Sequence, residues 1–195
     1  NTPSPMWLEA KSKFEQGNFK GADEALKVID MESETSMVLS ALDRNNEKAL
    51  IVASEWYTKA KTVMSNDSLQ MIERINNAYK YYGEALKILN KIQCSESIKQ
   101  TKFQYLSDFA ILAQCNNDYE LAEDKCNSAL SILRETTSDI SSAYLPDIAT
   151  TLNNLANLHL HTGKLIDAEN EYKESLSITK KLMKANPSAY LLYAM

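Results

Sequence analysis

The sequence predicts an all-α fold, a solenoid of stacked antiparallel helical hairpins. The 195-residue chain contains only four glycines and four prolines, which favours long helices joined by few turns. The segment SSAYLPDIA (141–149) recurs as PSAYLLYAM (187–195), at an offset of 46 residues. A period in this range is typical of a repeated supersecondary unit. Apolar and small residues also follow helical spacing on both sides of a central glycine.

The clearest hairpin is expected over residues 144–186. Both of its helices show i, i+3, i+4 spacing of apolar or small residues, at 152, 155, 156 and 158 and then at 165, 168, 172, 175 and 176. Pro146 suits a first helical turn, and Asp147 complements the helix dipole there. Gly163 can take the left-handed conformation that ends a helix. Asn186-Pro187 is expected to end the second helix.

The preceding hairpin, residues 98–141, has the same pattern. Its two helices carry Leu106, Phe109, Ala110 and Ala113, and then Tyr119, Ala122, Cys126 and Ala129. Small residues at such positions let two helix backbones approach closely, while large residues fill the neighbouring gaps. The shared pattern therefore predicts that the two hairpins are consecutive units of one array.

Two degenerate copies are expected nearer the start of this single domain, residues 1–195. In the segment 35–93, a first helix (Glu47–Met64) and the insertion SNDSLQM (65–71) precede a second helix that carries Ala78, Tyr82 and Ala85. In the segment 6–31, Gly17, Phe19 and Ala22 follow the order of the clear turn. Residues 189–195 align with 143–149, so they are expected to start a further helix.

The tyrosine cluster YKYYGEAL (79–86) belongs to the degenerate repeat. Tyr82 is expected in the core, with Tyr79 and Tyr81 at the interface with a neighbouring helix. Gly83 inside a helix costs about 1 kcal/mol relative to Ala. A close helix contact at Gly83 would explain that cost.

The hairpin positions resemble the tetratricopeptide repeat, in the longer form found in kinesin light chains and many bacterial repeat proteins. The residues that match the family pattern are Leu152, Leu155, Ala156 and His159 on the first helix, and Ala168, Tyr172 and Ser175 on the second. Lys180 stands where the family has a final Pro, so the second helix is expected to run further. The resemblance implies a right-handed superhelix that acts as a non-catalytic interaction module, binding a peptide or protein segment in its concave groove.

The resemblance also implies which residues face that groove. In the clearest hairpin they are Thr150, Asn153, Asn154, Asn157 and His161, and in the preceding one Gln104, Ser107, Asp108, Ile111 and Cys115. Side-chain amides can hydrogen-bond the backbone of an extended peptide without adding charge. Alternatively, Asn153 and Asn154 connect successive hairpins. A clamp for a C-terminal carboxylate is not expected, because the lysines and arginines it needs are absent and Asp108 would repel the ligand.

Charge and motifs argue against several other functions. The net charge is −5 and no basic stripe is visible, so nucleic acid is not an expected partner. No segment approaches the roughly 18 apolar residues that a membrane span needs. The nucleophile elbow, the P-loop, the HExxH motif and the dinucleotide fingerprint are absent from the sequence. We therefore expect no enzyme activity and no cofactor.

The histidines and cysteines are expected to be structural. His159 and His161 lie about 200° apart around a helix and cannot share a metal ion, so no metal site is expected. His159 takes an aromatic core position and is expected to be packed. The odd number of cysteines, Cys94, Cys115 and Cys126, favours free thiols in a reducing compartment, and hence a cytoplasmic location. The start, NTPSPMWLEA, lacks an initiating Met and a signal-peptide core, so a processed or excised start is expected.

A second function remains open from the sequence. The chain could serve as a spacer or oligomerisation arm within a larger signalling or regulatory protein. Residues 189–195 carry no charge and include several large apolar side chains. An uncapped solenoid end exposes an apolar face. Self-association of the chain through its C-terminal end is therefore expected.

Overall fold

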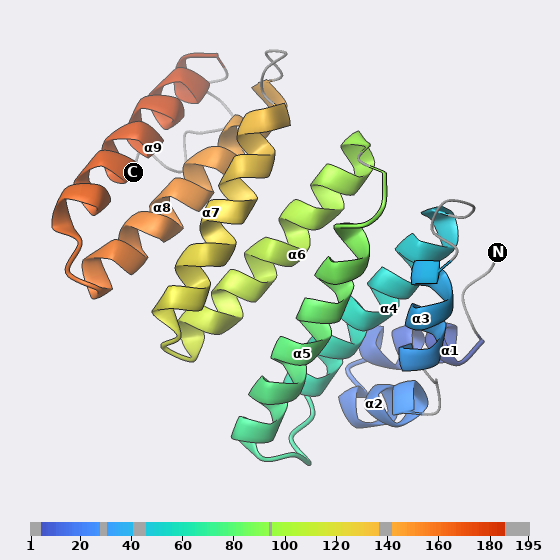
Figure 1. The fold of residues 1–195 in the computed structure, drawn as a ribbon. Helices are drawn as coiled ribbons and strands as arrows, with labels where there is room; N and C mark the ends of the chain where they lie inside the picture. Colours follow the sequence, from blue (N-terminus) through green and yellow to red (C-terminus); the bar gives the residue numbers. More distant parts are fainter. Residues whose placement is uncertain (1–4, 28–30, 41–45, 94, 137–141, 186–195) are drawn as a thin grey trace. The chain divides into compact units, whose positions relative to one another are not determined.

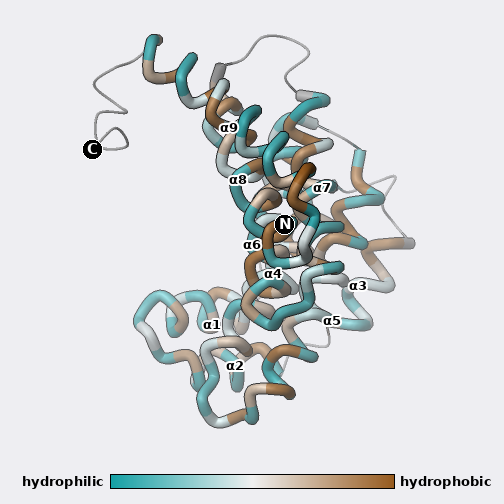
Figure 2. The backbone as a smooth tube through the Cα atoms, turned by 90° about the vertical axis from the view of Figure 1, so that its left-hand side faces the viewer, coloured by the Kyte–Doolittle hydropathy of each residue, from teal (hydrophilic) through white to brown (hydrophobic). Residues whose placement is uncertain are grey.

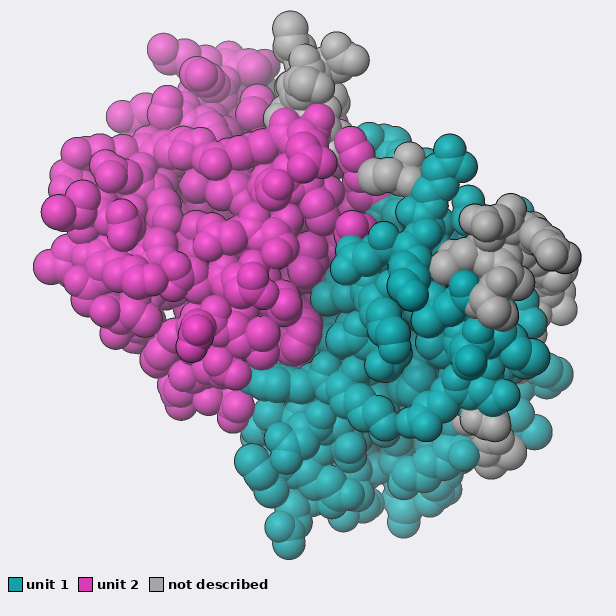
Figure 3. Space-filling view, in the orientation of Figure 1, with its two compact units in different colours: residues 1–98 teal, residues 99–195 magenta. Residues whose placement is uncertain are grey.

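The computed structural model of the chain describes residues 5–27, 31–40, 46–93, 95–136 and 142–185, and their regular structure is helical throughout (Figure 1). The α-helices within these ranges are α1 (Pro5–Glu15), α2 (Phe19–Lys27), α3 (Met31–Ser40), α4 (Asn46–Met64), α5 (Met71–Leu89), α6 (Glu96–Cys115), α7 (Tyr119–Thr136), α8 (Leu145–His161) and α9 (Leu165–Ala185). A single 3₁₀ turn, η3 (Ser142–Tyr144), leads into α8. The chain divides into two compact units, unit 1 (residues 1–98) and unit 2 (residues 99–195) (Figure 3).

Hydrophilic and hydrophobic residues alternate along the backbone of the described helices (Figure 2). Helix α9 runs through Lys180 to Ala185, so the second helix of the clearest hairpin is of the expected longer form. Helix α3 was not predicted from the sequence. The expected helix start at 189–195 lies outside the described residues.

Three hairpins share one turn, in which a left-handed residue follows the first helix. The residues are Gly17, Asn117 and Gly163, with φ angles of 75°, 60° and 76°. In each turn the amide of the following residue donates back to a carbonyl five positions earlier, at 2.8, 2.9 and 2.8 Å. This bond satisfies a carbonyl that the helix end leaves unpaired. The sequence analysis expected this turn at Gly163, and the Asn117 turn shows that Asn serves equally well.

The residue after the left-handed position starts the next helix. The Oδ1 atoms of Asn18 and Asp118 accept hydrogen bonds from the amides of Gly21 and Leu121, at 3.0 and 3.3 Å. These are N-caps of α2 and α7. Lys164 takes this place before α9 and cannot cap the helix, since a lysine side chain has no acceptor.

Unit 1 connects α4 to α5 through a longer segment, residues 65–70, whose conformation depends on buried polar contacts. Asn66 is almost fully buried, and its Nδ2 donates to the buried Asp23 Oδ2 of α2 at 2.8 Å. Arg74 donates to the Met64 carbonyl oxygen at 3.2 Å and to Asp67 Oδ1 at 2.7 Å. These bonds connect α2 to the α4–α5 segment and hold the insertion against the hairpin.

Tyr81 and Tyr82 are placed as expected, but the expectation for Gly83 is wrong. Tyr82 is buried, and the Tyr81 ring lies 5.4 Å from the Trp56 ring of α4. Gly83 is exposed, and a Cβ atom built on it meets nothing within 4 Å. No close helix contact within the described chain therefore explains this glycine.

The core of unit 2 joins three helices through aliphatic side chains. Leu130 and Leu133 of α7 pack with Ile148 and Leu152 of α8, with Phe103 of α6 beside them. Four alanines of these helices are completely or almost completely buried: Ala122 and Ala129 on α7, Ala156 on α8 and Ala168 on α9. Small side chains at these positions permit close packing of the helices.

Candidate peptide-binding surface

The polar face of α8 carries the residues that the sequence analysis assigned to the groove. Thr150, Asn153, Asn154, Asn157 and His161 follow one another at helical spacing and therefore lie on the same side of α8. Thr150, Asn153 and His161 are exposed, while Asn154 and Asn157 are partly buried. Among the described residues, the side chains of Asn153 and Asn154 have no hydrogen-bond partner. Their amide groups are thus available to a ligand.

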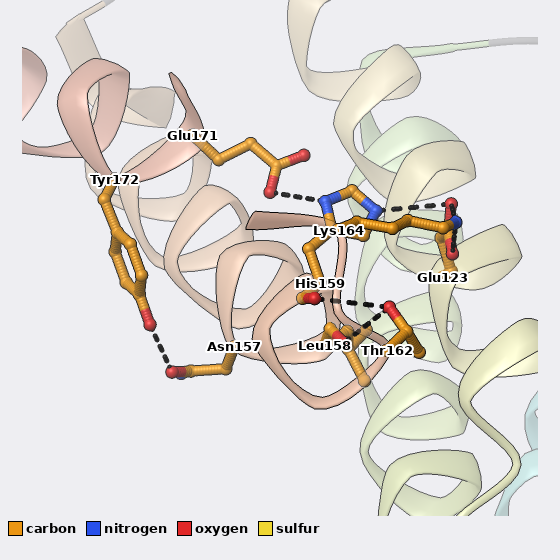
Figure 4. Close-up of polar contacts among 8 residues, drawn as sticks. All are labelled: Glu123, Asn157, Leu158, His159, Thr162, Lys164, Glu171 and Tyr172. Atoms are coloured by element: carbon orange, nitrogen blue, oxygen red, sulfur yellow. Dashed lines mark hydrogen bonds and ion pairs between the residues drawn. The ribbon is translucent and has the colours of Figure 1, made fainter. Parts of the chain in front are cut away.

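Asn157 is held in one orientation by its own hairpin. The hydroxyl of Tyr172 on α9 donates a hydrogen bond to Asn157 Oδ1 at 2.5 Å (Figure 4). Because Oδ1 is engaged, the Nδ2 group is left as the donor that Asn157 can offer to a ligand. Asn157 therefore has a structural contact and a free donor at once. Tyr172 was expected only as a residue of the repeat pattern on the second helix, without a link to this surface.

The other end of the α8 face is bordered by an aromatic pair. His161 stacks on Tyr119 of α7, with ring centroids 5.5 Å apart and planes within 6° of parallel. The exposed Thr150 hydroxyl is engaged within its own helix, since it donates to the Pro146 carbonyl oxygen at 2.9 Å. The stacked rings fix the position of His161 and offer an apolar surface beside the asparagines.

Helix α6 carries the second predicted set at the same spacing. Gln104 and Ile111 are exposed, and Ser107 and Asp108 are partly buried. Gln104 Nε2 donates to Asp108 Oδ1 at 3.0 Å, one turn along the same helix. This bond occupies part of the acceptor capacity of Asp108. Cys115, at the end of the set, is exposed.

His159 connects three consecutive segments of unit 2 through charged contacts (Figure 4). The ring is buried, as expected from its core position. Its Nδ1 lies 2.8 Å from Glu171 Oε2 of α9, and its Nε2 lies 3.3 Å from Glu123 Oε1 of α7, without the alignment of a hydrogen bond. Lys164 binds both oxygens of Glu123, at 2.8 and 2.6 Å.

The pKa values of the two carboxylates in this cluster are shifted in opposite directions. The hydrogen bond from Lys164 lowers the pKa of Glu123, with a further contribution from His159. Burial raises the pKa of Glu171 against the opposing effect of His159. Helical spacing could not reveal either partner of His159, because neither lies one helical turn away from it. Their contribution is to hold α7, α8 and α9 together.

Metal and thiol chemistry find little support in the described parts of the chain. No cluster of three or more potential metal ligands occurs there. Cys115 and Cys126 are free, and burial raises the pKa of the Cys126 thiol to about 11. A thiol of this kind is largely protonated at neutral pH and unreactive. Cys94 lies outside the described residues.

The fold and this surface define an α-helical repeat protein, and comparison with known proteins specifies the repeat. Residues 148–188 match the family model of the tetratricopeptide repeat. Residues 148–188 therefore correspond to a tetratricopeptide repeat, and the fold is an all-α solenoid of helical hairpins. Among curated proteins, none matches this sequence. No helix in the described ranges has the length and apolar character needed to cross a membrane.

One solved structure with a similar fold supports the architecture. The crystal structure of BtubC (BKLC) from P. vanneervenii aligns with a TM-score of 0.61 at 17% identity, and covers 91% of this chain. This chain spans 63% of the length of BtubC. Two structures of MamA align with TM-scores of 0.48 and 0.38, at 13% and 14% identity. They cover 93% and 90% of this chain, and 93% and 96% of MamA. At these identities the comparisons concern the fold alone.

Proposed function

We propose that this chain is a non-catalytic protein-interaction module that binds an extended peptide or protein segment along the polar face of α8. The matching face of α6 contributes the second side of the surface. One observation supports this proposal most directly: Asn153 and Asn154 present unpartnered amides on the same face where Tyr172 orients the Asn157 donor. Tetratricopeptide repeats generally mediate protein–protein interaction, which agrees with this role.

The chemistry of the surface favours a particular kind of ligand. An extended segment has backbone N–H and C=O groups that no secondary structure satisfies. Asparagine amides offer both a donor and an acceptor, and they add no charge. Thr150, Asn153, Asn154 and Asn157 are all uncharged, so the surface suits a neutral backbone better than a phosphate or a free carboxylate. Ile111 and the stacked rings of His161 and Tyr119 would receive apolar side chains of the ligand.

The test begins with a partner found by peptide array or pull-down with the purified chain. The double variant Asn153→Ala, Asn157→Ala should weaken binding by about 1–3 kcal/mol, because the ligand loses its amide partners. The matched control is Asn170→Ala, an exposed asparagine of α9 outside this face. Tyr172→Phe should give an intermediate loss, since the ring stays while the bond that orients Asn157 is removed.

Stability measured in parallel separates the alternatives. If binding is unchanged while the melting temperature of the double variant collapses, the asparagines connect helices and do not bind the partner. The chain would then fit the alternative role, a spacer or oligomerisation arm within a larger protein.

We further propose a cytoplasmic location. The three cysteines cannot all pair with one another, and Cys115 and Cys126 are both free thiols. Free thiols persist in reducing compartments. Cell fractionation of the natural host would test this, and recovery in an oxidising compartment would contradict it.

A further inference from the structure

An open apolar groove lies between α8 and α9, outside the asparagine face. Its volume is about 350 Å³, and its lining includes Leu160, Leu165, Tyr172 and Leu176, with Glu169 and Lys173 at the rim. The three leucines are 49%, 63% and 53% exposed. Exposed aliphatic side chains that share one groove are characteristic of interaction sites, whereas scattered ones are ordinary.

The same groove exists one hairpin earlier, where it is filled. Shifting the lining residues of α9 by 46 positions gives Tyr119, Glu123, Cys126 and Leu130 on α7. There Cys126 and Leu130 are buried, each 5% exposed. The segment that covers them is α8, since Ile148 and Leu152 pack against Leu130. The molecule thus contains one copy of this groove with a helix in it.

At the polar rim of the filled groove, an acidic residue contacts basic groups at the end of the helix that fills it. Glu123 contacts His159 near the end of α8, and it also binds Lys164 just after α8. The corresponding rim residue of the open groove is Glu169, which is exposed and pairs with Lys173 of its own helix at 2.6 Å. A helix in the open groove would bring a cationic group or a histidine to Glu169 at the same register.

We propose that the α8–α9 groove docks an amphipathic helix of a partner protein, oriented as α8 lies on α7. The partner helix carries an aliphatic stripe equivalent to Ile148 and Leu152, which covers Leu176. About two turns further on it carries a histidine or lysine, which meets Glu169. Apolar burial provides the binding energy, and the charged contact fixes the direction of the helix. This groove adjoins the asparagine face at Tyr172, which lines the groove and bonds Asn157. Its ligand is a helix, whereas the asparagine face would bind an extended segment.

The filled groove supplies a probe for the open one, because α8 is itself a helix with the required stripe. A fluorescently labelled peptide of residues 142–162 would be titrated with the full chain, and its anisotropy measured. A dissociation constant of about 100 µM or tighter is expected. A scrambled peptide of the same composition should not bind.

Two substitutions on α9 form a matched pair. Leu176→Glu places a charge in the groove and should weaken peptide binding at least about tenfold, because an ionised carboxylate cannot be buried against an aliphatic stripe. Ile166→Glu is the control, since Ile166 is 77% exposed and does not line the groove. Both residues are exposed, so circular dichroism and the melting temperature should be unchanged. Asn153→Ala should also bind the peptide normally, which separates this proposal from the proposed function.

Three results would overturn the proposal. The first is no binding at a peptide concentration of about 1 mM. The second is binding that Leu176→Glu leaves intact, which would mean that the peptide displaces α8 from its own site. The third comes from sedimentation velocity of the chain alone. If the chain dimerises and Leu176→Glu abolishes the dimer, the occupant is a second copy of this chain and no partner helix is needed.

Discussion

Gly83 and Gly163 have different backbone conformations, and only that of Gly163 requires a glycine. Gly163 has a φ of +76°, a region that L-residues other than Asn rarely adopt. Gly83 lies inside α5 with helical backbone, and open space surrounds its missing side chain. The first glycine is required by the backbone, and the second only weakens its helix. A residue that looks equivalent in the sequence therefore has opposite effects on stability.

Alanine at each glycine should show this difference. Gly83→Ala should raise the free energy of unfolding by about 0.5–1 kcal/mol, the propensity gain of Ala in an exposed helix interior. Gly163→Ala should lower it by about 1 kcal/mol or more, because Ala is strained at this φ angle. Urea denaturation followed by circular dichroism measures both. Effects of the same sign would contradict this account.

Ala122 shows how a single small residue sets the distance between helices. It is completely buried on α7, next to partly exposed neighbours. Ala122→Leu should lower the free energy of unfolding by about 1–3 kcal/mol, since the added atoms have no space in the packed contact. Asn127→Leu, at an exposed position of the same helix, is the control. If the two variants melt alike, the assignment of α7 residues to the helix contact is wrong.

At the scale of elements, the contacts of His159 and Lys164 join α7 to α8 and α9. Glu123 is their common partner, and the hydrogen bond from Lys164 holds its pKa below the ordinary value of 4.5. A carboxyl whose folded-state pKa is lowered stabilises the protein above its unfolded pKa. This contribution is lost as the pH falls through the folded-state pKa. The cluster therefore strengthens helix packing at neutral pH and ceases to do so in acid.

Removing the charge of Glu123 should reveal this pH dependence. Glu123→Gln should lower the free energy of unfolding by about 0.5–1 kcal/mol near neutral pH, the range of partly exposed ion pairs. The difference from the parent should shrink towards zero as the pH falls through the folded-state pKa of Glu123, because the parent carboxyl is then protonated as well. Glu120→Gln, exposed on the same helix, serves as the control. A constant difference across this range would show that packing of the side chain, and not its charge, matters.

At the scale of the whole molecule, the chain consists of two compact helical units, and the described residues contain no strand. Far-UV circular dichroism of the full chain should therefore indicate more than about 65% helix, because no segment of the sequence alternates with a period of two. The spectrum is measured at a concentration series, with a thermal scan to confirm cooperative loss of the helical signal. A strand content above about 10% would exclude an α-solenoid.

Much of the architecture could be predicted because its causes are local. The i, i+3, i+4 spacing around Gly163 predicted the α8–α9 hairpin, and the alanines at 122, 156 and 168 predicted the close helix contacts. A left-handed turn residue and a small side chain act through their own backbone and their immediate neighbours. The same logic explains the turn at Asn117, which the sequence analysis did not single out. Asn tolerates that conformation, but it also occurs in many others.

The surface could be predicted only in part. The spacing of Asn153, Asn154 and Asn157 placed them on one face of a helix, as the structure has them. Their role as ligand donors stays a prediction. That Tyr172 orients Asn157 was not visible, because the two residues lie 15 positions apart on different helices. Helical spacing determines on which side a residue lies, but not which side chain of the next helix reaches it.

The sequence by itself determined most of the helices, the two clear hairpins and the turn at Gly163, since each follows from a period or from a backbone preference within a few residues. Only the tertiary structure decided which polar side chains meet. Asp23 and Asn66 bond across 43 positions, and His159 meets carboxylates of two other helices. It also decided that Gly83 faces open space and that, among the described residues, no helix occupies the α8–α9 groove. The physical reason is that such contacts depend on how helices cross and on which rotamers fit between them, and neither is encoded in a local pattern.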